Sequence, residues 1–163
     1  MNTSPVTLRP QIIYWLFNNL FLIAFGLLIL SASLYFKSSF QPLIYMGLIV
    51  FFFTIILSFY KYIEIRYCTK WVITEEQIKI YKGVFLRSVN YIELYRIFDY
   101  EEKKSFIQLL LKNTNIIVRS GDKSSPILVI FGIKAGTGIV DLIRERVEIQ
   151  KQKKSIYEIT NRI

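Results

Sequence analysis

The sequence predicts an α+β membrane protein, in which a hairpin of two transmembrane helices precedes a small antiparallel sheet domain closed by a helix. The first observation is an unequal distribution of charge, because all 12 Asp and Glu and 19 of the 21 Lys and Arg lie after residue 60. The second is a change of period, from long uncharged runs before that residue to alternating apolar residues after it. The chain therefore combines segments suited to two different solvents.

Two uncharged runs predict the membrane spans within residues 1–60. Residues 12–36 form a run of 25, about 37 Å long as a helix with a rise of about 1.5 Å per residue. Residues 43–60 form a run of 18, near the lower limit for a span. The segment KSSFQP between them is typical of a hairpin tip. A cleaved signal peptide is disfavoured, because the first run exceeds an ordinary h-region and no A-x-A-like site follows it.

Positive charges predict the orientation of this hairpin. Arg9 precedes the first span, Lys37 alone occupies the tip, and three basic residues crowd the end of the second span. The positive-inside rule then places both termini in the cytoplasm. Anionic lipids attract basic residues near the membrane by about 1 kcal/mol each, although ordinary surface charge is an equally good explanation. The residues expected to contact the membrane surface are Lys61, Arg66, Lys70, Lys151, Lys153 and Lys154.

Small residues predict where the two spans approach each other. Folding the chain at the tip brings Gly47 level with Ala32, which allows close packing of the helix backbones. We place Asn18 and Asn19 in the inner headgroup zone rather than in an interhelical hydrogen bond, because the first span is longer than it needs to be. Neither span contains a charged residue or a histidine, so the sequence indicates no ion path.

After residue 60 the alternation predicts about seven strands and one helix, in a domain of residues 61–150 followed by a basic tail of residues 151–163. The first strand is expected over KYIEIRYCTKWVIT, with a bulge near Cys68, and QIKIYKG pairs back on it. Further strands are expected in RSVNYIEL, RIFDYEEKK, NIIVRS and ILVIF. Apolar residues four apart from Ile139 onward predict the final helix.

The order of these segments resembles the bacterial membrane-flanked pleckstrin-homology-like (PH-like) proteins of the YdbS-like group, over about residues 10–150. Three patterns carry the resemblance: I-T-x-x-x-I-x-x-x-x-G at 73–83, I-x-L-x-x-I at 92–97 and S-x-x-Q-x-L at 105–110. The resemblance implies a PH-like β-barrel or sandwich, and a short helix rather than a strand at 105–111. Where members commonly carry glycine, this chain has KNTN at 112–115. Either the loop is longer or an asparagine takes the left-handed conformation.

The residues after position 60 show little sign of catalytic chemistry. The chain has no histidine, which excludes triads that use it. Glu101 and Glu102 adjoin Lys103 and Lys104, a pattern typical of a solvated charge cluster. The lone Cys68 is interpreted as a small strand residue. We therefore predict no enzyme activity, no cofactor and no metal site.

Three ligand classes are also disfavoured. The loop TEEQ at 74–77 stands where some eukaryotic PH domains carry basic residues for phosphoinositides, and its two carboxylates would repel such a headgroup. GIKAGTG has neither the spacing nor the lysine of a nucleotide-binding loop. Basic residues are dispersed and form no recognition motif for nucleic acid.

The sequence therefore predicts a non-catalytic binding or assembly module, anchored as a multi-pass protein at the cytoplasmic face of a bacterial inner membrane. Expected partners are the lipid bilayer with its anionic lipids, an unidentified protein, and a second copy of the chain. An accessory protein that protects against envelope stress or membrane-active peptides is an alternative that the resemblance allows. A membrane enzyme or transporter subunit is disfavoured by the uncharged spans. With no linker after the second span, we expect the domain to be held against the inner leaflet.

Overall fold

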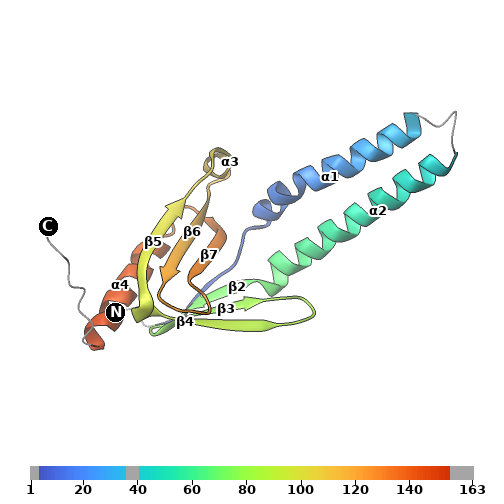
Figure 1. The fold of residues 1–163 in the computed structure, drawn as a ribbon. Helices are drawn as coiled ribbons and strands as arrows, with labels where there is room; N and C mark the ends of the chain where they lie inside the picture. The colour runs from blue at the N-terminus through green and yellow to red at the C-terminus, as the bar shows by residue number, and fades with distance from the viewer. Residues whose placement is uncertain (1–3, 36–40, 155–163) are drawn as a thin grey trace.

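The computed structural model describes residues 4–35 and 41–154, so the predicted hairpin tip around Lys37 and most of the predicted tail lie outside the described residues. Two long helices, α1 (Ile12–Tyr35) and α2 (Gln41–Ile63), run antiparallel and project together from one end of a body of strands (Figure 1). Most residues of each helix are apolar, and Lys61 near the end of α2 is the one charged residue in the two helices. Pro42 lies in the first turn of α2, where its missing N–H costs no helical hydrogen bond.

The predicted strand over residues 61–69 is wrong. Helix α2 continues to Ile63 and passes into a π-helical turn, Glu64–Cys68, so that strand β2 (Lys70–Ile73) begins only afterwards. The N–H and the hydroxyl of Thr69 both donate to the carbonyl oxygen of Glu64, at 2.9 and 3.0 Å. Extending an existing helix gains one hydrogen bond for each residue ordered, and this outweighs the local alternation of apolar residues. Cys68 consequently ends a helical turn and is not a strand residue.

The first sheet contains a strand that the sequence pattern did not predict. Strand β1 (Val6–Leu8) lies before α1 and pairs antiparallel with β2, with Leu8 opposite Trp71. Strands β3 (Gln77–Lys82) and β4 (Ser88–Glu93) complete the order β1-β2-β3-β4. The helical hairpin is therefore inserted between the first two strands of one sheet, and the sheet includes residues from both sides of it.

The second sheet confirms the predicted later strands. Its strands are β5 (Ile97–Lys103), β6 (Asn113–Ser120) and β7 (Ile127–Lys134), in the order β5-β6-β7. A 3₁₀ turn, Leu94–Arg96, connects β4 to β5. Among the described residues the strands form separate sheets of four and three, so the fold is a two-sheet α+β arrangement compatible with a PH-like fold and not a closed barrel.

Two predictions about helices in the domain are confirmed. The short helix α3 (Phe106–Leu110) is stabilised by a capping box, in which Ser105 and Gln108 each bond the backbone N–H of the other. The C-terminal helix α4 (Ile139–Lys153) also takes in the start of the predicted tail. The left-handed residue before β6 is Lys112, with φ 52°, rather than one of the asparagines.

Helix α4 closes the hydrophobic core between the two sheets. Its residues Ile143 and Val147 are almost fully buried, together with Trp71, Ile73 and Ile130 from the strands. Full burial of an isoleucine side chain contributes about 1.5–3 kcal/mol relative to exposure. The core therefore holds α4 against both sheets.

Candidate functional site

The base of the helical hairpin is attached to the second sheet through α1. The N–H of Gln11 donates to the carbonyl oxygen of Gly132 at 2.8 Å, and the Tyr14 ring stacks on Phe131 with centroids 4.9 Å apart. Phe131 in turn packs edge-on against the buried ring of Trp71, at 5.0 Å. Gly132 has φ 64°, and a Cβ there would lie 2.8 Å from Tyr14. The close approach of α1 to β7 therefore requires glycine.

The second helix is attached through its own continuation. The π-helical turn joins α2 to β2 with Thr69 as the intervening residue, and its Ile65 is buried. Lys61 forms an exposed ion pair with Glu64 at 2.8 Å, three residues further along the same helical segment. Both legs of the hairpin are thus connected to the sheets by ordered, hydrogen-bonded backbone, which limits hinge motion between hairpin and domain.

Within the hairpin, the two helices approach closely at two pairs of small residues. The two residues on each helix, Gly26 and Ser33 on α1 and Gly47 and Thr54 on α2, are seven positions apart. A Cβ at Gly47 would lie 2.2 Å from the Ser33 hydroxyl, and a Cβ at Gly26 would lie 2.4 Å from the Thr54 hydroxyl. Ala32, which we predicted to lie level with Gly47, borders the same gap between the helices. The contact at Gly26 was missed, although the shared spacing of seven residues, which keeps side chains on one helix face, is visible in the sequence.

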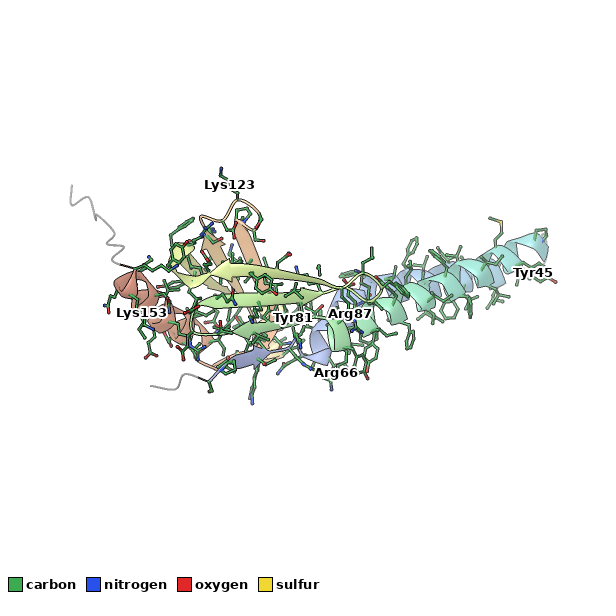
Figure 2. All side chains as sticks on the ribbon, turned by 90° about the horizontal axis from the view of Figure 1, so that it is seen from below. Tyr45, Arg66, Tyr81, Arg87, Lys123 and Lys153 are labelled. Atoms are coloured by element: carbon green, nitrogen blue, oxygen red, sulfur yellow. The ribbon has the colours of Figure 1, made fainter. Side chains whose placement is uncertain are left out.

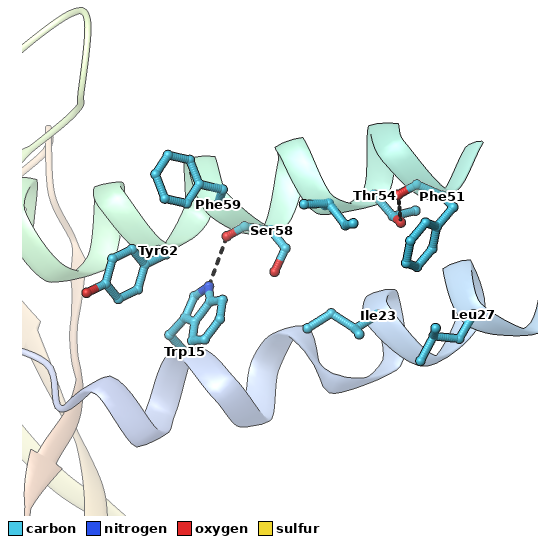
Figure 3. A pocket seen from close by; sticks show the side chains of 9 residues that line it. Trp15, Ile23, Leu27, Phe51, Thr54, Ser58, Phe59 and Tyr62 are labelled. Atoms are coloured by element: carbon cyan, nitrogen blue, oxygen red, sulfur yellow. Dashed lines mark hydrogen bonds between the residues drawn. The ribbon is translucent and has the colours of Figure 1, made fainter. Parts of the chain in front are cut away.

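Polar groups near the base bond within and between the two helices. The indole N–H of Trp15 donates across the hairpin to the carbonyl oxygen of Ser58 at 3.0 Å (Figure 3). The amide of the buried Asn19 donates to the carbonyl oxygen of Trp15 at 3.0 Å, within its own helix. The Ser58 hydroxyl is buried and finds no hydrogen-bond partner among the described residues.

A mainly apolar gap of about 450 Å³ lies beside these groups. Figure 3 shows the side chains of both helices around it. The lining residues are Trp15, Ile23, Leu27, Phe51, Thr54, Ile55, Ser58, Phe59 and Tyr62. Such a gap suits hydrocarbon better than a polar ligand, because nearly all of its surface is apolar.

The six basic residues predicted to touch a membrane fall into two groups. Arg66 lies at the base of the hairpin, whereas Lys153 lies at the opposite end of the domain (Figure 2). Lys61 and Lys70 belong to the first group, and the ammonium of Lys70 lies 4.4 Å from the centre of the Tyr81 ring. Lys151 and Lys154 belong to the second group, at the end of α4. The structure therefore places only three of the six basic residues at the hairpin base, and the other three at the far end of the domain.

The TEEQ loop is the turn between β2 and β3, so it is the second connection of the sheet and not the first. In an antiparallel meander, successive turns lie at opposite ends of the strands. The exposed Glu75 and Glu76 are therefore at the end of the sheet away from the hairpin. The first connection of the sheet, between β1 and β2, contains the whole hairpin, so TEEQ does not occupy the first loop, contrary to what the sequence had suggested.

The other polar cluster singled out in the sequence consists of ion pairs on strands. Glu101 lies 3.3 Å from both Lys103 and Arg119, and Glu102 lies 3.1 Å from Lys104. The hydrogen bond from the Lys104 ammonium lowers the pKa of Glu102. Across residues 4–35 and 41–154, no group of three or more acidic or cysteine side chains is placed to hold a metal ion.

The chain matches the family model of the bacterial PH domain over residues 11–148. It therefore belongs to the bacterial PH domain family. The match begins just before α1 and continues into α4, so the hairpin lies inside the family pattern while β1 precedes it. No curated protein and no solved structure matches the chain. Membership of the YdbS-like group stays a prediction.

Proposed function

We propose that this protein is a non-catalytic binding or assembly module, held by the α1–α2 hairpin in a bacterial inner membrane with its PH-like domain on the cytoplasmic face. One observation carries the proposal. The helical segment Ile44–Cys68 is long and apolar enough to cross a membrane, and only 17% of its apolar window is buried within the protein. The core helix of a water-soluble protein would instead be mostly buried.

The first helix supports the same interpretation. The described apolar stretch of α1, Asn19–Tyr35, is shorter, yet Phe21, Phe25 and Leu28 on it are all more than half exposed. Contiguous apolar surface of this extent is rare on soluble monomers and marks an interface with lipid or protein. The arrangement of Arg9, Lys37 and the basic group at the hairpin base favours cytoplasmic termini.

The binding role is inferred from the family and from the division of the surface. PH-like folds host many functions, so the fold supports a binding module without naming its ligand. If the hairpin is in the bilayer, α4 and the β2–β3 turn face the cytoplasm, because they lie at the end of the domain opposite the hairpin (Figure 1). These elements are where we expect a protein partner to bind.

Topology is tested by chemical labelling of single cysteines in a Cys68→Ser background. Lys37→Cys should react with an impermeant maleimide in spheroplasts, and Lys123→Cys, in an exposed loop, only after the inner membrane is permeabilised. Release of the protein by alkaline carbonate, or equal labelling at both sites in intact spheroplasts, would refute the anchored arrangement.

The binding role is tested by crosslinking and mass spectrometry in native membranes. A stoichiometric partner crosslinked to lysines of α4 supports an assembly module. A growth defect of the deletion strain that appears only under attack by membrane-active peptides, without such a partner, would favour the protective alternative. Turnover of a lipid or solute by purified protein would overturn the non-catalytic role.

A further inference from the structure

Two apolar protrusions extend from the sheet domain beside the base of the hairpin. One is the β3–β4 turn, residues 83–87, in which Phe85 and Leu86 are 86% and 90% exposed. The other is helix α3, in which Phe106 and Leu110 are 77% and 71% exposed. Single exposed apolar residues are ordinary, but large side chains gathered at two tips indicate contact surfaces.

The shape of the first protrusion is imposed by its backbone. Gly83 has φ 98°, and a Cβ there would lie 1.9 Å from the carbonyl oxygen of Leu86. Only glycine permits this tight turn. The turn leaves Phe85 and Leu86 without burial against the domain, so their exposure is a property of the fold and not of a loose loop.

Sheet topology places the β3–β4 turn on the hairpin side. In the antiparallel order β1-β2-β3-β4, the first and third connections lie at the same end of the strands, and the first connection is the hairpin itself. The Phe85 ring stacks on the Tyr60 ring near the end of α2, with centroids 6.1 Å apart. Figure 1 and Figure 2 show the turn lying alongside the base of α2.

The second protrusion borders the other helix. Ile107 of α3 and the adjoining Leu111 line a hollow of about 330 Å³ together with Tyr14, Phe17 and Phe21 from the first turns of α1. In Figure 1, α3 lies beside the start of α1, on the opposite side of the hairpin from the β3–β4 turn. The two protrusions thus flank the hairpin at the level where both predicted spans reach the domain.

Basic residues stand directly next to both apolar tips. Lys82 and Arg87 bracket the β3–β4 turn, and Lys112 follows α3, all three exposed. Apolar tips with adjoining cations suit the interfacial layer of a bilayer, where the apolar groups enter the acyl boundary and the cations reach anionic headgroups. A single protein partner would instead have to bridge both sides of the hairpin.

We propose that the β3–β4 turn and α3 insert their apolar side chains into the interfacial layer of the bilayer that holds the hairpin. The PH-like domain then rests on the membrane at three points, and its tilt is set by the fold rather than by surface charge alone. This inference rests on the proposed anchoring, and it adds Phe85, Leu86, Phe106 and Leu110 to the residues expected to contact lipid.

The test is site-directed spin labelling of the full chain in nanodiscs that contain anionic lipid. Single cysteines replace Phe85, Leu110, Glu75 and Phe52 in a Cys68→Ser background, and collision with oxygen is compared with collision with a water-soluble nickel chelate. Position 52, in the middle of α2, reports the hairpin, and position 75, in the exposed turn at the end of the sheet away from the hairpin, is the matched aqueous control. Positions 85 and 110 should show oxygen-to-nickel ratios between these two.

Other ratios would refute either the three-point contact or the anchoring, depending on the position that shows them. Aqueous ratios at 85 or at 110, with a lipid ratio at 52, refute the three-point contact and leave the anchoring intact. An aqueous ratio at 52 refutes the anchoring itself. In a second measurement, Phe85→Asp with Leu86→Asp should shift position 110 toward the aqueous ratio, whereas Ser124→Asp with Ser125→Asp should not. An unchanged ratio at 110 would show that the turn does not hold the domain.

Discussion

Arg146 of helix α4 donates a hydrogen bond to the carbonyl oxygen of Ile73, at the end of β2, over a distance of 2.8 Å. The same guanidinium donates to the carbonyl oxygen of Ser4 at 2.9 Å, just before β1. A buried arginine therefore ties the last helix to the two strands that flank the helical hairpin.

Replacing Arg146 with Met should destabilise the domain by about 1–3 kcal/mol, because two backbone carbonyls lose their charged donor. Thermal unfolding in nanodiscs, followed by near-UV circular dichroism, measures the change. Arg144→Met, on the exposed face of the same helix, is the matched control and should stay within about 0.5 kcal/mol. Equal effects of the two variants would contradict the role given to Arg146.

Substituting Gly47 with Val should separate the two helices of the hairpin, because the new side chain meets both the hydroxyl and the Cβ of Ser33. Overpacking of this kind costs about 1–3 kcal/mol. Resistance to unfolding by sodium dodecyl sulfate measures the loss. Ile49→Val, on the exposed side of α2, should have little effect. The smaller clash of Gly47→Ala should be relieved by adding Ser33→Gly, and failure of that rescue would argue against direct contact.

Substituting Gly83 with Ala should distort the β3–β4 turn, because a methyl group cannot fit 1.9 Å from a carbonyl oxygen. Strain at such a position costs about 1–3 kcal/mol. Hydrogen exchange at the ends of β3 and β4 should become faster. Gly136→Ala tests the left-handed conformation alone, because its φ is 75° and no atom lies within 4 Å of the added Cβ. The Gly83 variant should therefore be the more destabilised of the two.

The two groups of basic residues should differ in their effect on lipid. Replacing Lys61, Arg66 and Lys70 with Gln should reduce the anionic lipid that remains bound after purification, since each cation near the surface contributes about 1 kcal/mol. Replacing Lys151, Lys153 and Lys154 with Gln should leave lipid binding unchanged, because they lie at the other end of the domain. Native mass spectrometry counts the bound lipids. Equal losses in both triple variants would place the membrane elsewhere.

A pH-dependent contribution is expected at Glu93. A hydrogen bond from the Tyr95 hydroxyl, aided by the Arg96 guanidinium, lowers the pKa of the Glu93 carboxyl. A lowered folded pKa stabilises the protein above the ordinary glutamate range of about 4.3, and this stabilisation is lost as pH falls through the folded value. Tyr95→Phe should raise the pKa of Glu93, as measured by carbon-13 NMR. Asp122, whose pKa is lowered mainly by the N–H of Ser124, is the internal control.

Local sequence patterns were enough to predict most elements. The uncharged runs became α1 and α2, and the alternation around Ile78 and Ile80 became β3, because each pattern matches the period of the structure it forms. The capping residues Ser105 and Gln108 are equally local, yet α3 was predicted through the family resemblance rather than from them.

Tertiary pairing decided what the local pattern could not. Val6–Leu8 is too short to show a period, and it becomes a strand only because the edge of β2 offers unpaired backbone groups. The stretch from Lys61 to Cys68 alternates like a strand, yet it follows the helix already formed before it.

The sequence by itself determined that an apolar hairpin precedes an antiparallel sheet domain that ends in a helix, since solvent preference and periodicity are properties of neighbouring residues; the PH type was implied by the family resemblance. Only the tertiary structure decided that the hairpin emerges between β1 and β2, and that Phe85 and Tyr60 meet at its base. It also placed Arg66 and Lys153 at opposite ends of the domain. Such relationships depend on which strand edges pair and where the core closes, and these contacts join residues far apart in the chain.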